Sequence, residues 1–433
     1  MTKRGQVSTP GDSAVFGPGI GSRRTDTGIA LRAVTADDVA AEDLLTSGHR
    51  ALLDQLHEDA TAANTTRTYR SPTERFRGWC AEYGYQALPA DPDTVAAFLA
   101  EAEAERDGDV YRYPTSTLGM WAAAIRKTHL DAGLSDPTTA PTVRKALVSI
   151  QKHRTAAGQE ATGADPLLAD DVRVLVDSIT RHSADADWKA QVAACRDIAL
   201  IVCTFYAGRR RSEIAAIQFG DLTVIADEDD PGRRWIQLRI RGSKTSRTKV
   251  EYVALPRSND PRYCPRCRLL EWLMVVTTHD NMVETAKDRG DTENQRLRST
   301  RQAVIRLVNK LTDRDPHLHH CDRDLPFQRR ATAPVWRALE KNTRYLPVDR
   351  GPVTDQIVSR VLKKRCREAG FAPEHIARIS GHSLRSGFVT QSFRAGVPVE
   401  DIMRQTGHKR VETVLRYDKN PIYRNNAVNQ IPL

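Results

Sequence analysis

Two histidines, an arginine and a tyrosine stand at short, fixed spacings near the C-terminal end of the chain. His382 and Arg385 are three residues apart, so on a helix both side chains can face one target. A second histidine, His408, follows a glycine, and Tyr417 comes nine residues after it. The first N–H groups of a helix that begins beside His382 would favour an anion. This spacing indicates a site for a phosphate-like group.

Two further segments supply groups of the same kind. Arg210 stands in an Arg-Arg-Arg-Ser-Glu run, where Glu213 lies one helical turn further on and can hold a neighbouring group. Apolar and polar residues alternate over 236–241 and again over 250–254, with Gly and Ser between them, which predicts a β-hairpin. Lys244 would lie at the tip of that hairpin.

This set of groups suits attack on a phosphodiester by a protein nucleophile. A nuclease with two metal ions would need several converging carboxylates instead. Arginine forks can hold the non-bridging oxygens and offset the charge of the transition state. Tyrosine has a pKa of about 10 and becomes a good nucleophile only when a base or a cationic site removes its proton.

The ordered set resembles the catalytic residues of the tyrosine site-specific recombinases, the phage integrase family. The similarity spans about residues 49 to 425 and is closest to the Cre-like branch. It implies a mainly α fold with a small antiparallel sheet, made of an all-helical core-binding domain and a mixed α/β catalytic domain. The matching residues are Arg210, Lys244, His382, Arg385, His408 and Tyr417.

The resemblance implies a role for each residue in strand cleavage. Tyr417 would attack phosphorus, form a 3′-phosphotyrosyl link and release a 5′-hydroxyl. Lys244 would be the general acid for that oxygen, and His382 would assist proton transfer at the tyrosine.

The other implied roles concern the phosphate. Arg210 and Arg385 would bind it, His408 would add a hydrogen bond, and Glu213 would keep the site in order. The family exchanges strands twice, through a Holliday junction, in a homotetramer on two double-stranded DNA sites. We therefore expect DNA as partner, a monomer or weak oligomer when free, a possible directionality factor, and neither metal nor cofactor.

Alternatives remain open at several positions. Tyr423 is a rival nucleophile, although it lies 15 residues beyond His408 and off the family spacing. Arg209 or Arg211 could replace Arg210, and Lys249 could replace Lys244. The chain could also be a DNA-binding accessory protein of the same fold, a type IB topoisomerase or a telomere resolvase.

Composition fits this interpretation. The chain has 433 residues, a formal net charge of +10, 40% hydrophobic and 28% charged residues. An excess of basic residues favours a polyanionic partner, most often nucleic acid. Seven scattered cysteines do not suggest a disulfide framework, and no secretory signal is visible, so we expect a soluble, cytoplasmic, nucleoid-associated protein encoded by a bacterium, phage or plasmid.

Periodicity and composition divide the chain into segments. We expect a flexible arm over 1–45, a helical DNA-binding domain over 46–156 and a linker over 157–167. A catalytic domain would follow over 168–420, with a polar surface insertion at about 277–325, and then a C-terminal tail over 421–433 that could dock on a neighbouring protomer. A stripe from Tyr69 to Tyr83 that includes Phe76, Trp79 and Cys80 reads as core.

Contacts to DNA are expected from two places in the first domain. Asn64 could cap a helix whose positive N-terminal end would carry four polar or basic residues, and a second helix from about 114 to 129 would present two cations. The six candidates are Thr65, Thr66, Arg67, Arg70, Arg126 and Lys127.

Cys264 and Cys267 have the spacing of half a zinc site. His317, His319, His320 or Cys321 could complete it. Half a motif does not establish a site, and the family often has a Cys-Pro pair that leads into a helix here, so metal binding stays open.

Overall fold

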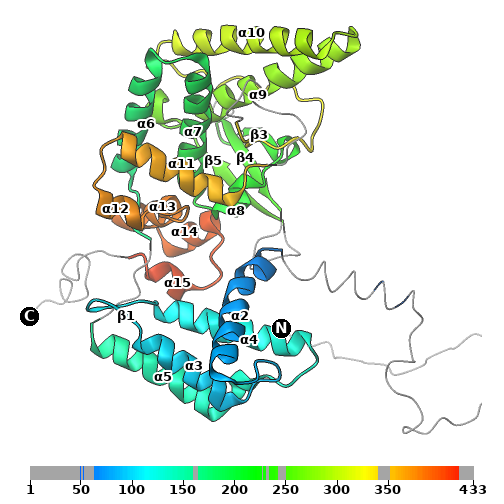
Figure 1. Cartoon of the computed structure of the whole chain (residues 1–433). Helices are drawn as coiled ribbons and strands as arrows, with labels where there is room; N and C mark the ends of the chain where they lie inside the picture. The colour runs from blue at the N-terminus through cyan, green and yellow to red at the C-terminus, as the bar shows by residue number, and fades with distance from the viewer. Residues whose placement is uncertain are drawn as a thin grey trace, which may run out of the picture. The chain divides into compact units, whose positions relative to one another are not determined.

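The computed structural model describes residues 49, 52, 63–158, 164–226, 228–230, 234–241, 250–339 and 352–418, with the backbone alone for 63–67. The chain divides into two units, 1–161 and 162–433. Both are mainly helical, and a small antiparallel sheet lies in the second (Figure 1). The predicted arm over 1–45, the tail over 421–433, Lys244, Lys249 and Tyr423 all lie outside the described residues.

The described part of the first unit contains four α-helices and a small hairpin, in which each of the two strands has two residues. The side chain of Asp91 accepts a hydrogen bond from the N–H of Asp93 and caps the second of these helices. Buried apolar residues such as Phe98 and Trp121 join the helices into one core. The elements are α2 (Ala63–Tyr83), α3 (Pro92–Ala104), β1 (Arg106–Asp107), β2 (Val110–Tyr111), α4 (Thr115–Asp131) and α5 (Pro141–Ala156).

Two predictions for α2 were wrong. The helix already includes Ala63, so Asn64 lies within it and does not precede it as a cap. Phe76 and Cys80 are buried as expected, but Tyr83 is 50% exposed at the end of the stripe. Its ring stacks on Tyr85, which is equally exposed, and its hydroxyl donates to Glu101 of α3 at 3.2 Å, so the stripe leaves the core where the helix ends.

The second unit places helices around a three-stranded antiparallel sheet of order β3-β4-β5. Helix α7 lies at the centre of its core, capped at the start by Asp187 and ended by Gly208 in the left-handed conformation. The elements are α6 (Ala169–Ala184), α7 (Trp188–Ala207), α8 (Arg211–Ala215), β3 (Leu222–Ala226), β4 (Arg234–Ile240), β5 (Glu251–Leu255), α9 (Pro265–Asp288), α10 (Glu293–Thr312), α11 (Asp355–Glu368), α12 (Pro373–Arg378), α13 (Ser383–Arg394), α14 (Val399–Thr406) and α15 (Val411–Leu415).

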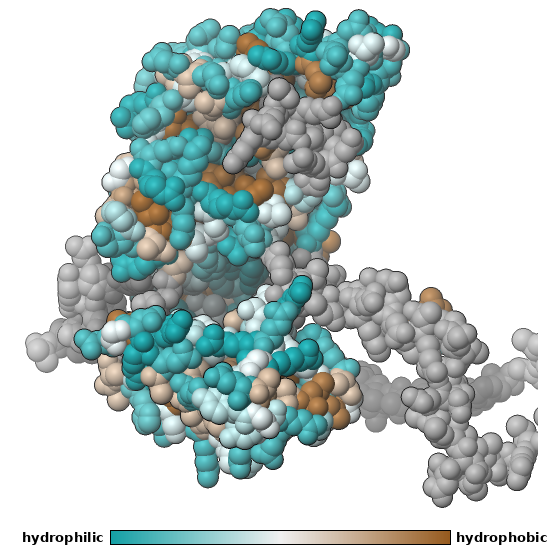
Figure 2. Space-filling view, in the orientation of Figure 1, coloured by the Kyte–Doolittle hydropathy of each residue, from teal (hydrophilic) through white to brown (hydrophobic). Residues whose placement is uncertain are grey.

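Surface and core follow from these elements. By length and hydropathy α7 alone among the described helices would suit a membrane, but 72% of its apolar window is buried, as in the core helix of a globular domain. The surface seen in Figure 2 is mostly hydrophilic, with hydrophobic residues confined to small patches.

Two segments of the second unit differ from the sequence predictions. The end of the predicted linker is bound to the catalytic unit, since Leu167 is fully buried and its N–H donates to Ser383. The predicted insertion over 277–325 instead continues α9 to Asp288 and adds α10, whose Val304 and Val308 enter the core. The amphipathic piece around Val304 and Val308 is therefore part of a long helix that packs on the core.

The hairpin was predicted, but β3 and the inward face of β5 were not. Leu238 pairs with Val253, and Ile236 with Leu255, and all four are buried. Tyr252, which the alternation had placed with the apolar set, is 54% exposed. Successive side chains of a strand point to opposite faces, so an assignment displaced by one residue places the wrong set of side chains in the core.

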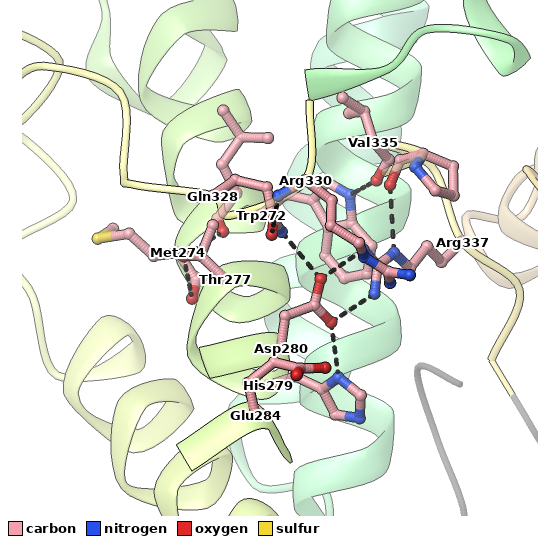
Figure 3. Close-up of polar contacts among 12 residues, drawn as sticks. Trp272, Met274, Thr277, His279, Asp280, Glu284, Gln328, Arg330, Val335 and Arg337 are labelled. Atoms are coloured by element: carbon pink, nitrogen blue, oxygen red, sulfur yellow. Dashed lines mark hydrogen bonds and ion pairs between the residues drawn. The ribbon is translucent and has the colours of Figure 1, made fainter. Parts of the chain in front are cut away.

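A buried ion pair ties the segment before Arg337 to α9 (Figure 3). Nη1 and Nη2 of Arg337 each donate to the Asp280 carboxylate at 2.7 Å, Gln328 Nε2 donates at 2.8 Å, and His279 Nδ1 lies at 3.0 Å. Trp272 Nε1 donates to the Val335 carbonyl at 2.8 Å. Burial alone would raise the pKa of Asp280, but His279 and Arg337 hold it well below its usual value.

Asp280→Asn is expected to destabilise the protein by about 3–5 kcal/mol, because the charge of Arg337 stays buried without a partner. A lowered carboxyl pKa stabilises the fold above the unfolded value of about 3.9, and this contribution is lost as the pH falls below it. The variant should therefore lose less stability on acidification. Denaturant unfolding at several pH values measures both effects.

The matched control is Asp288→Asn, whose side chain is 65% exposed and pairs with Arg329 at 3.5 Å. We expect it to change stability by less than about 0.5 kcal/mol. Equal effects of the two substitutions would contradict the role given to the buried pair.

Candidate active site

Arg385 is fixed inside the second unit by two backbone carbonyls. It lies in the first turn of α13 and is 1% exposed. Its Nη1 donates to the carbonyl of Gly208 at 3.0 Å and to that of Thr406 at 2.6 Å. Its Nε has no hydrogen-bond partner among the described residues. A buried donor left in this state is costly, and an anion at this point would satisfy it.

The three consecutive arginines have different partners. Arg210 donates from Nη1 to Glu213 Oε1 at 2.8 Å and keeps a quarter of its side chain exposed. Arg211 donates to Ser359 at 2.8 Å. Arg209 is 1% exposed and pairs with Glu251, at the start of β5. Arg211 is more exposed, but Arg210 has the larger influence on the pKa of Arg385, which indicates that its charge lies beside that residue.

Tyr417 lies against His382. The Oη and Nε2 atoms are 2.7 Å apart. The tyrosine follows α15, donates its backbone N–H to Val414, and packs on a small apolar cluster of α13, α14 and α15. Burial raises the pKa of Tyr417, while Arg385 and Arg210 act to lower it.

The sequence after His408 predicts an apolar seam of Val411, Val414 and Leu415 beside Tyr417, and this prediction was mostly wrong. Val414 is fully buried, but Val411 and Leu415 are 45% and 46% exposed. The helix has only five residues, so a single turn cannot bury three apolar side chains on one partner. Of the three, only Val414 anchors α15 in the apolar cluster, and Tyr417 packs at the edge of that cluster.

Both histidines of the site are neutral at neutral pH. Burial, then the charges of Arg385 and Arg210, lower the pKa of His382 to about 4 and that of His408 to about 3. Neutral His382 can therefore accept the proton of Tyr417. The arginine charges that contribute to these shifts also favour an anion at the site.

Hydrogen bonding assigns the tautomer of His408. The Thr406 hydroxyl donates to the Ile402 carbonyl at 2.6 Å, so its oxygen accepts from His408 Nδ1 at 2.7 Å. Nδ1 of the neutral ring then carries the proton, and Nε2 does not. A bound phosphate would raise the pKa of His408 and allow Nε2 to gain a proton and donate to it.

Sequence reasoning missed a second ion-pair group. Glu251 pairs with Arg209 on one oxygen and accepts from Lys409 Nζ at 2.5 Å on the other. Burial would raise the pKa of Glu251, but these two cations lower it. No local spacing in the sequence predicts a contact between residues 209, 251 and 409, which lie far apart along the chain.

Gly407 makes this contact possible. Its φ is 73°, and a Cβ added there would lie 2.2 Å from Arg209 Nη1. Only glycine can end α14 here and leave room for the arginine beside His408. The glycine of the Gly-His pair thus positions both the histidine and the ion pair.

The structure describes three of the six predicted DNA contacts, all in the first unit. Arg70 is exposed and pairs with Glu74 at 2.9 Å. Arg126 lies 3.2 Å from Asp136, and Lys127 donates to Asp131 at 2.8 Å. Each cation has a neighbouring carboxylate that DNA would have to displace. The side chains of Thr65, Thr66 and Arg67 lie outside the description.

Comparison with known proteins finds similarity to recombinases. The profile described as the phage integrase family matches residues 270–421, a range that contains His382, Arg385, His408 and Tyr417. An integrase/recombinase xerD homolog from Selenomonas ruminantium is 25% identical over 378 residues, which cover 86% of this chain and 87% of the relative.

Solved structures of recombinases are also similar to the chain. A XerH site-specific recombinase bound to a palindromic difH substrate, in a post-cleavage complex, has 14% identity and a TM-score of 0.46, over 84% of this chain and 79% of that one. The Tn1549 transposon integrase with transposon right end DNA has 11% identity and a TM-score of 0.42, over 88% and 97%.

The family match covers the C-terminal region, and the alignment with the xerD homolog spans most of both chains. Together with the phage integrase profile, this similarity supports an enzyme of the tyrosine recombinase class that acts in site-specific DNA recombination.

Proposed function

We propose that the protein cuts and rejoins double-stranded DNA at specific sites through a 3′-phosphotyrosyl intermediate. The observation that carries this proposal is the 2.7 Å contact of the Tyr417 hydroxyl with neutral His382, next to buried Arg385. A nucleophile, its base and an anion site lie together there. The helical first unit supports a Cre-like arrangement of two domains.

Cleavage would begin with transfer of the Tyr417 proton to His382 Nε2. The phenolate oxygen then attacks phosphorus, the bond from phosphorus to the 5′ oxygen breaks, and Lys244 protonates that oxygen. Nε of Arg385 and the open part of Arg210 would hold the non-bridging oxygens, and Glu213 would orient Arg210. His408, once protonated, would add a donor.

Rejoining is the reverse reaction with another strand. The 5′-hydroxyl of a partner duplex attacks the phosphotyrosyl link and releases Tyr417, so the phosphodiester energy is conserved without ATP. The first exchange forms a Holliday junction, and a second exchange converts the junction into recombinants. A homotetramer on two DNA sites, with a directionality factor where direction is controlled, would support this sequence in the cytoplasm.

A strand-exchange assay tests the function. Two linear duplexes that carry the site found beside the gene are incubated with the protein without ATP, and products of new length are separated on a gel. We expect recombinants from duplexes with the site and none from duplexes of scrambled sequence. Relaxation of supercoiled plasmid without the site, and no recombinants, would indicate a topoisomerase instead.

A further inference from the structure

Four potential metal ligands converge in the second unit, at the N-terminal end of α9. Cys264 precedes the first residue of α9 and Cys267 lies in its first turn, while His319 and Cys321 lie on the segment after α10 (Figure 1). The three sulfur atoms and one ring nitrogen all lie within 4.8 Å of one another. All three cysteines are fully buried.

The separations match tetrahedral coordination. His319 Nδ1 is 3.4 Å from Cys267 Sγ and 3.6 Å from Cys321 Sγ, and Cys264 Sγ is 3.9 Å from Cys321 Sγ. Zinc bonds of about 2.3 Å to sulfur and about 2.05 Å to nitrogen, at tetrahedral angles, imply separations of about 3.6 Å from sulfur to nitrogen and about 3.8 Å between sulfurs. A disulfide would bring its sulfurs to about 2.05 Å.

The surroundings fit a site with three thiolates. Arg266, between the two cysteines of α9, is 1% exposed and donates to the carbonyls of Cys321 and Arg234. Three thiolates with one divalent ion carry a net negative charge, which this guanidinium and the N-terminal end of α9 would offset.

His320, which lies between the ligands His319 and Cys321, holds these two residues against α9. His320 Nε2 lies 3.2 Å from the Cys267 carbonyl and 3.2 Å from Glu271, so the backbone on either side of it is held against α9. The ligands are thus supported by bonds that involve none of the four ligand atoms. This is the arrangement expected of a built metal site.

We propose that Cys264, Cys267, His319 and Cys321 bind one Zn²⁺. Sulfur-rich tetrahedral sets select zinc among divalent ions, and four protein ligands leave no position for a substrate, so the site is structural. The ion links α9 to a segment more than 50 residues further along the chain. It fixes that segment beside α9 and β4, through Arg266 and Arg234. This differs from the expectation of no metal and goes beyond the recombination chemistry.

Metal content of the full-length protein tests the proposal. Protein purified without chelators is expected to contain one zinc per chain, and Cys267→Ser or His319→Ala to reduce it to background. Cys366→Ser is the matched control, because this cysteine of α11 is equally buried and lies outside the cluster. Retention of zinc by both cluster variants would overturn the assignment.

Cobalt distinguishes a folded site from loss of structure in the variants. Wild-type protein reloaded with Co²⁺ should show thiolate charge-transfer and tetrahedral d–d absorption. His319→Cys should keep the metal and change that spectrum, since a fourth thiolate replaces nitrogen. No uptake of Zn²⁺ or Co²⁺ by reduced wild type, or a Cys264–Cys321 disulfide found by alkylation and mass spectrometry, would refute the proposal.

Discussion

Arg385→Ala is expected to lower the single-turnover rate of strand cleavage by about 10²- to 10³-fold, the usual effect of removing one donor to a developing oxyanion. Arg385 is already fixed by two carbonyls before DNA binds, so its donors need no reorganisation when phosphate arrives. Arg385→Lys should also be slow, because an ammonium cannot both hold these carbonyls and present a fork to phosphate.

Arg394→Ala is the matched control for this prediction. Arg394 ends the same helix, α13, and is exposed. We expect cleavage within about twofold of wild type, as for most surface substitutions. Thermal unfolding of every variant separates loss of chemistry from loss of fold. A folded Arg385→Ala protein that cleaves at the control rate would contradict the phosphate role.

His382→Asn is expected to lower the cleavage rate by about 10²- to 10⁴-fold, the range for loss of a positioned general base. Because Nε2 lies 2.7 Å from the tyrosine oxygen, no other described group is needed to take the proton. His375→Asn, on α12, is the control and should cleave at the wild-type rate. The measurement is single-turnover cleavage of nicked DNA with protein in excess.

The pH dependence gives an independent signature of the same residue. The pKa of His382 is lowered to about 4, so the base is lost as the pH falls through that value. A bound phosphodiester adds negative charge and moves this pKa upward, toward the ordinary value of about 6.5. Wild type should therefore slow on acidification, with a midpoint between the two values. The same acidic limb in His382→Asn would show that another group is the base.

Sequence predicted the parts of the site that depend on local spacing. The three-residue step from His382 to Arg385 follows from one helical turn, and glycine before His408 marks the end of α14. Tyr417 follows from its distance to that glycine. Each of these relations lies within one or two short helices, where the chain geometry is nearly fixed by residue type.

Relations between distant segments were not predictable in this way. The contact of Arg209 with Glu251 and Lys409 joins a loop, a strand and a helix end. The cysteine pair at 264 and 267 predicted only two of the four ligands of a metal site. The other two, at 319 and 321, follow a helix that the composition had assigned to a surface insertion. Which face of β5 is buried depended on pairing with β4.

The central claim is that Tyr417 is the nucleophile. The most direct measurement is a suicide-substrate assay, in which DNA nicked near the cleavage point of the recombination site traps the covalent product, without ATP. Wild type and Tyr423→Phe are predicted to give a denaturant-resistant adduct on the 5′-side fragment, and Tyr417→Phe none. An adduct that survives in Tyr417→Phe and disappears in Tyr423→Phe would contradict the account.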